Sequence, residues 1–184
     1  VFGLLLKFEF QTSTSCFPVI HYGLMLVSLQ GPAPEGIMNM LNMTAPLEMG
    51  ICIGDPERMI GFYQNVLGFE LISDLEVPPE KSGPAGFGRE GYRIIRLQTS
   101  FGERIKLVHP GSEPEDRSTG GEVLSRKGNV YLTFIVEDLK TTVARIRSYG
   151  APVRTEGEIV EVREGVFLSI LDDPEGNHLE FVEY

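Results

Sequence analysis

The chain has 184 residues, of which 42% are hydrophobic and 23% are charged, so it is long enough to bury a core and has the composition of a globular protein. Its formal net charge of -10 argues against nucleic acid and anionic membrane surfaces as partners. Two cysteines, Cys16 and Cys52, are too few for a disulfide framework or a cysteine metal motif, so a reducing cytoplasm is expected.

Residues 1–43 are predicted to be an N-terminal extension. Two apolar patches, at 1–6 and 24–29, are separated by polar residues and Pro18, so neither approaches the roughly 20 apolar residues of a membrane-spanning helix. A run rich in glycine and proline at 31–36 is typical of a linker. We expect the extension to precede the native start of the protein or to form a disordered arm. The alternative is an extra strand or helix packed on the domain.

The first regular pattern follows this linker. Residues 48–53 alternate in polarity, which predicts a half-buried strand. Asp55 and Pro56 are typical of a helix start, residues 58–67 have helical apolar spacing, and Gly68 suits the left-handed helix end. Further strands are predicted at 69–75, 92–99 and 104–109.

The same order of elements recurs in the second half. Residues 130–136 alternate, Asp138 is a suitable cap for a helix that runs to Tyr149, and Gly150 ends it. A run with the sequence DDPEGN, at 172–177, is a strong turn signal. Further strands are predicted at 152–155, 159–162, 167–171 and 178–183.

These elements predict one α+β domain at 44–184, made of module one (47–112) and module two (128–184). Each module has a strand, a helix and about three further strands. Neither module alone could bury its sheet, so we expect the two βαβββ units to pair. The predicted architecture is a curved mixed sheet with helices on its outer face and a central cleft on its inner face.

Two motifs resemble signatures of the vicinal-oxygen-chelate superfamily, which comprises glyoxalases, bleomycin-resistance proteins and dioxygenases. Residues 62–71, FYQNVLGFEL, resemble its FYxxVLGF signature, and residues 172–181, DDPEGNHLEF, resemble its closing hairpin. The segment at 136–138, followed by a helix ending at 149–151, resembles the middle of its second module. The resemblance covers about residues 46–184 and implies the glyoxalase-like fold and a homodimer. It specifies no reaction, because this fold hosts many functions.

Strand alternation assigns the side chains that face the cleft without reference to any family. Apolar residues such as Ile95 and Leu107 are expected to pack beneath a helix, and their neighbours point the other way. The predicted cleft is therefore polar and carries both charges. Its expected side chains include Glu48, Cys52, Arg96, Arg104, Lys106, Asn129, Tyr131, Ser169, His178 and Glu180.

Metal-dependent members of the superfamily hold a divalent ion at four inward-facing positions. The resemblance places Glu48, Lys106, Asn129 and Glu180 at these positions. Protonated Lys106 cannot ligate and repels a cation, which argues against a glyoxalase-type Zn²⁺ or Ni²⁺ site. Alternatively, His178 with the two glutamates would give a set acceptable for Fe²⁺, Mn²⁺ or Zn²⁺, unless His178 faces solvent or only supports the site.

A metal-free interpretation gives Lys106 the charge that a metal would supply. Lys106 would then pair with Glu48 or Glu180 and reduce the repulsion between these carboxylates. Arg96 and Arg104 would recognise a carboxylate or phosphate, and the alternative for both is a solvated rim.

Together, the residues and the resemblance favour a lyase- or isomerase-type enzyme, similar to lactoylglutathione lyase, that acts on a small carbonyl or anionic metabolite. Glu48 and Glu180 would act as general base and acid, together with Lys106. The ligand contacts are assigned to Arg96, Arg104, Asn129, Tyr131 and His178. One alternative is a metal-independent protein that binds a drug or toxin and confers resistance. Another is a dimeric scaffold with a vestigial site.

Overall fold

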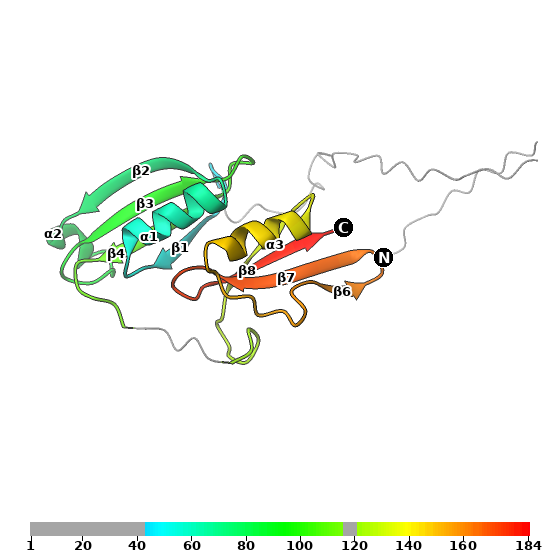
Figure 1. Ribbon diagram of the computed structural model, residues 1–184. Helices are drawn as coiled ribbons and strands as arrows, with labels where there is room; N and C mark the ends of the chain where they lie inside the picture. The colour runs from blue at the N-terminus through cyan, green and yellow to red at the C-terminus, as the bar shows by residue number, and fades with distance from the viewer. Residues whose placement is uncertain (1–42, 116–120) are drawn as a thin grey trace, which may run out of the picture. The chain divides into compact units, whose positions relative to one another are not determined.

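The computed structural model describes residues 43–115 and 121–184, and Figure 1 shows their helices and strands. Residues 43–184 form one compact unit. The predicted extension at 1–43 lies outside the described residues, apart from Met43. Module one contains β1 (Glu48–Cys52), α1 (Pro56–Gly61), the π-helical segment η1 (Phe62–Val66), β2 (Glu70–Val77), α2 (Pro79–Ser82), β3 (Tyr92–Gln98) and β4 (Arg104–Pro110). Module two contains β5 (Tyr131–Ile135), α3 (Leu139–Ser148), β6 (Val160–Arg163), β7 (Val166–Asp172) and β8 (His178–Glu183).

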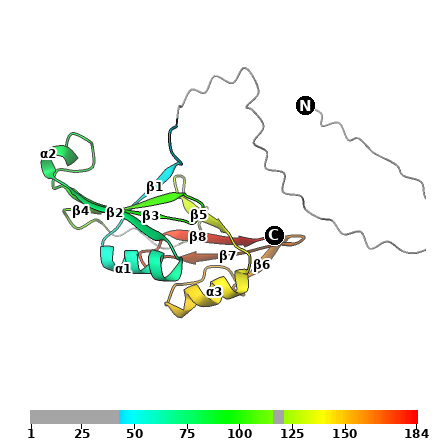
Figure 2. The same cartoon turned by 90° about the horizontal axis from the view of Figure 1, so that it is seen from above.

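The strands form two four-stranded mixed sheets, which confirms the predicted fold class. The first sheet has the order β1-β4-β3-β2, and the second has the matching order β5-β8-β7-β6. In each sheet the first strand of the module pairs in parallel with the last, and the other pairs are antiparallel. Figure 2 shows α1 against one face of the first sheet and α3 against one face of the second. We call the other face of each sheet its open face.

The helix formed by α1 and η1 and helix α3 each begin at an aspartate cap and end at a glycine, as the local sequence predicts. The side chain of Asp55 accepts a hydrogen bond from the Arg58 backbone N–H at 3.1 Å, and Pro56 is the first helical residue. The helix therefore starts at the predicted Asp55 and Pro56, and its second half is π-helical. Gly68 then adopts a φ of 77°, which side chains rarely tolerate. Helix α3 is built in the same way, with an aspartate cap and a glycine end. No helix in the described ranges is long and apolar enough to span a membrane.

Burial follows the predicted strand alternation at most positions. The helix-facing residues Ile53, Ile95, Leu97, Ile105 and Leu107 are at most 5% exposed and belong to one core cluster. Ser169 is an exception to the prediction. It pairs with the core residue Phe181, is fully buried and faces the helix rather than the cleft. Because β7 is apolar on both faces, its sequence alone could not fix which residues point inward.

Two contacts join the closing hairpin of module two to module one. The Tyr63 hydroxyl, on η1, donates to Asp173 Oδ2 at 3.0 Å, and Tyr63 is fully buried. The Glu175 carboxylate accepts hydrogen bonds from the backbone N–H groups of Gly54 at 2.9 and 3.0 Å and Asp55 at 2.6 Å. Burial raises the pKa of Asp173, although hydrogen bonds from Asn177, from the Glu175 backbone and from Tyr63 oppose the shift. The hairpin therefore links the two sheets through a buried carboxylate that needs all its donors.

We predict that Tyr63→Phe lowers the free energy of unfolding by about 1–3 kcal/mol, because it leaves the buried Asp173 carboxylate without one donor. Urea denaturation followed by far-ultraviolet circular dichroism measures this change. Tyr149→Phe is the matched control, since Tyr149 is 60% exposed. Equal stability of the two variants would show that the hydroxyl contact contributes little.

Candidate functional site

Four charged side chains gather on the open face of the first sheet. The β1–β4 pairing places Glu48 opposite Arg104, and the β3–β4 pairing places Arg96 opposite Lys106. The Glu48 carboxylate lies 3.7 Å from Arg96 Nε, 3.6 Å from Arg104 Nη1 and 3.6 Å from Lys106 Nζ. These four residues are called the cationic cluster. The sequence therefore placed its members correctly on one face.

The cationic cluster carries a formal charge of +2, because three cations surround one carboxylate. Its side chains are 23–35% exposed, so solvent reaches them but screens them less than fully exposed charges. Arg104 Nε donates to Gln98 Oε1 at 2.6 Å, and Arg96 Nη1 donates to Ser73 Oγ at 3.4 Å. These contacts orient both guanidinium groups while leaving other N–H donors available to an anion.

The other predicted residues lie on or beside the second sheet. Glu180, on β8, accepts a hydrogen bond from Thr133 on β5 at 2.6 Å. Tyr131 opens β5 and is 41% exposed. Asn129 precedes β5, and its amide donates to Val123 O at 2.8 Å. Glu48 and Glu180 thus belong to different sheets, each with its own contacts.

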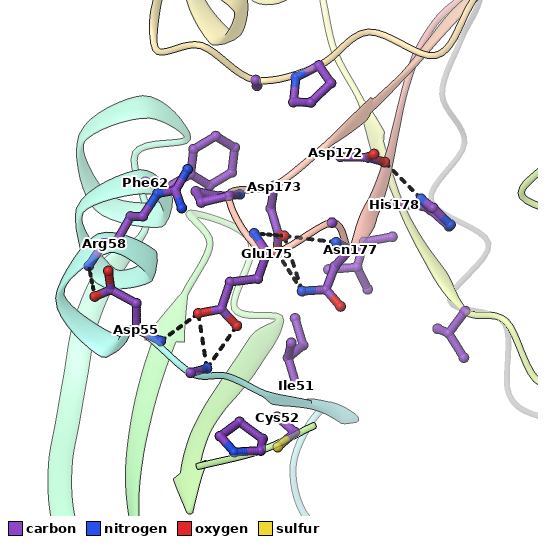
Figure 3. Close-up of a pocket in the computed structure, with 18 of the residues that line it drawn as sticks. Ile51, Cys52, Asp55, Arg58, Phe62, Asp172, Asp173, Glu175, Asn177 and His178 are labelled. Carbon is purple, nitrogen blue, oxygen red and sulfur yellow. Dashed lines mark hydrogen bonds and ion pairs between the residues drawn. The ribbon is translucent and has the colours of Figure 1, made fainter. Parts of the chain in front are cut away.

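His178 lies in a groove between the two modules rather than beside Glu48. It is 6% exposed, and its Nδ1 is 2.8 Å from Asp172 Oδ1. Asp172 Oδ1 also accepts from Arg154 Nε at 2.6 Å. All three residues line a groove of about 1480 Å³, part of which Figure 3 shows. The sequence pattern at 172–177 indicated a turn of the closing hairpin but not a site. The turn could have predicted the contact between Asp172 and His178, because residues that flank a hairpin turn are cross-strand partners.

The residues of the metal positions do not fit a divalent ion. Within the described part of the chain, no three histidine, cysteine, aspartate or glutamate side chains gather closely enough to hold one. Glu48, His178 and Glu180 do not form such a group in the described residues, where His178 is instead buried against Asp172. Lys106 and two arginines surround Glu48 and would repel a cation.

Comparison with known proteins places the chain in a family. A model of the Glyoxalase/Bleomycin resistance protein/Dioxygenase superfamily matches residues 41–181, and the chain belongs to this superfamily. It is similar to the lactoylglutathione lyases of Haemophilus influenzae (26% identity over 132 residues) and Salmonella typhimurium (29% over 136 residues), with 71% of this chain and 86% of each relative covered. Its fold is similar to that of a glyoxalase family protein from Bacillus cereus, with a TM-score of 0.67 and 21% identity over 79% of this chain and 97% of that one.

We predict that Lys106→Glu binds Mn²⁺ or Zn²⁺ at least about tenfold more tightly than the wild type, because it replaces a repelling charge beside Glu48 with a second carboxylate. Isothermal titration calorimetry on protein without a histidine tag measures the affinity. Lys106→Gln is the control that removes charge without adding a ligand, and it should show a smaller gain. Tight binding of either ion by the wild type would contradict the proposed mismatch.

Proposed function

We propose that the protein binds a small anionic molecule on the open face of the first sheet without a bound metal. The observation that carries this proposal is the contact of the single Glu48 carboxylate with three cations. One carboxylate cannot neutralise Arg96, Arg104 and Lys106 together. The remaining positive charge favours a carboxylate or phosphate ligand.

The distances within the cationic cluster also support a ligand site. Charge-assisted hydrogen bonds between nitrogen and carboxylate are typically about 2.7–2.9 Å long, whereas the contacts of Glu48 are 3.6–3.7 Å. Glu48 therefore holds the cations near one another without saturating their N–H donors. An anion could accept those donors, and the planar guanidinium groups favour two-oxygen recognition.

We predict that glycolate and inorganic phosphate bind this face, and that Arg96→Ala or Lys106→Gln weakens binding about five- to tenfold, because a charge-assisted hydrogen bond is lost. Glu48→Gln should instead strengthen binding, since it removes the negative charge from the cationic cluster. Calorimetric titration at low ionic strength measures each affinity, and added salt should weaken it.

Arg93→Ala is the matched control for this experiment. Arg93 lies on the same strand as Arg96 but on the opposite face, where it contacts Glu57 of α1 and Asp74 of β2. Its loss should leave anion binding unchanged. If Arg93→Ala and Arg96→Ala weaken binding equally, the anion binds through the general charge of the protein and not at this face.

A second candidate is a lyase- or isomerase-type reaction at the same face. It is favoured by the similarity to curated lactoylglutathione lyases and by the position of Glu48 among cations. Glu48 would act as a general base on a carbon next to a carbonyl, and the cations would stabilise the developing oxyanion. Lactoylglutathione lyase activity that Glu48→Gln abolishes would support this candidate. Anion binding without turnover would support binding alone.

We further propose that two copies of the chain associate through the second sheet. An apolar row crosses its open face through Ile135, Val182, Leu168 and Val160, which are neighbours in the strand register. Ile135 is 66% exposed and Val160 is 40% exposed, although both are apolar. Glu180 lies beside this row and is opposite in charge to the cationic cluster. A two-fold pair would bring each acidic, apolar face against the cationic face of the other copy.

We predict that the protein is a dimer in solution and that Ile135→Lys shifts it toward the monomer, because a charge in the apolar row is costly to bury. Size-exclusion chromatography with light scattering measures the mass at several concentrations. Leu124→Lys is the control, since Leu124 lies in a loop and is 82% exposed. A monomeric wild type would rule out the association.

A further inference from the structure

The Asp172–His178 pair in the groove has a fixed direction of hydrogen bonding. Asp172 Oδ1 accepts from Arg154 Nε at 2.6 Å and lies 2.8 Å from His178 Nδ1. A carboxylate paired with a guanidinium is ionised and can only accept. His178 Nδ1 therefore donates in this contact, and in a neutral ring Nε2 is then the acceptor. Figure 3 shows the His178 ring turned toward Asp172, away from the contacts that Glu175 makes.

The second ring nitrogen of His178, Nε2, is accessible to solvent. Among the described residues, the buried side-chain nitrogen or oxygen without a hydrogen-bond partner is Ser169 Oγ. His178 Nε2 makes no hydrogen bond within the described ranges and is not fully buried, although the residue as a whole is only 6% exposed. His178 is one of the residues that line the groove, so a ligand bound there would lie beside its ring. A base held by a buried carboxylate at the wall of a groove is suited to contact a ligand.

The lining of the groove has the opposite formal charge to the cationic cluster. Seven carboxylates and four cationic side chains line it, so its formal charge is negative. A negative groove attracts cations and repels anions. An ammonium group donates hydrogen bonds and accepts none, which matches a neutral imidazole acceptor.

We propose that this groove is a second ligand site, which takes a small molecule bearing a protonated amine, with the amine donating a hydrogen bond to His178 Nε2. Asp172 positions the ring, and its charge favours the cation. This site uses none of the residues of the cationic cluster. Its existence is independent of the anion site proposed above, and either site can fail without the other.

The test uses two matched probes, ethanolamine and glycolate, which each carry a hydroxyl group but have opposite charges. Long-range ¹H–¹⁵N correlation spectra at about pH 8, above the ordinary pKa of histidine, report the tautomer and environment of each ring. The chain has three histidines, and His178→Gln and His109→Gln identify the signals. The expected result is a protonated Nδ1 and a bare Nε2 on His178, with a saturable shift by ethanolamine and none by glycolate.

Variants separate this site from the cationic cluster. Asp172→Asn should weaken the ethanolamine effect about fivefold, the loss expected for one charged contact. Lys106→Gln should leave it unchanged while reducing glycolate binding. A proton on His178 Nε2, the absence of a saturable shift, or an equal response to glycolate would overturn the proposal. The tautomer and the probe response are measured on wild-type protein, so the test stands even if Asp172→Asn does not fold.

Discussion

The carboxylate of Asp173, buried at the start of the closing hairpin, joins the two modules of this protein. It accepts the Tyr63 hydroxyl from module one, the backbone N–H of Glu175 and both the backbone and side-chain N–H groups of Asn177. A carboxylate taken out of water is costly unless each lone pair has a donor, and the hairpin supplies most of them locally. The remaining donor comes from another module, so the hairpin is completed only when the modules meet.

This junction lies next to elements that carry both proposed ligand sites. The same hairpin places the Glu175 carboxylate against the backbone N–H groups of Gly54 and Asp55, directly after β1. One side of the hairpin continues into β8, where His178 contacts Asp172 across the strand pair. The groove between the modules and the orientation of β1 therefore depend on one short turn. Its proline and glycine provide the required backbone geometry.

The distribution of charge distinguishes this chain from a metal-dependent arrangement of the same fold. Lys106 occupies a position that the resemblance assigns to a ligand, and the structure adds Arg96 and Arg104 around the same glutamate. A metal ion normally supplies positive charge at such a place. Here side chains supply the positive charge, so the anion binding that we propose needs no metal. The groove between the modules is lined by residues outside the cationic cluster and has the opposite formal charge.

The sequence by itself determined the order of elements, the fold class and most strand faces. The alternation of polar and apolar residues along a strand is a local property, and it correctly grouped Glu48 with Arg96, Arg104 and Lys106 on one face. It failed at Ser169, because β7 is apolar on both sides and its pattern does not show which residues face the helix. Only the tertiary structure decided which faces meet. It placed Glu48 and Glu180 in two sheets rather than in one, and it enclosed His178 beside Asp172. Such long-range relations depend on how sheets pack, and periodicity along one strand does not encode them.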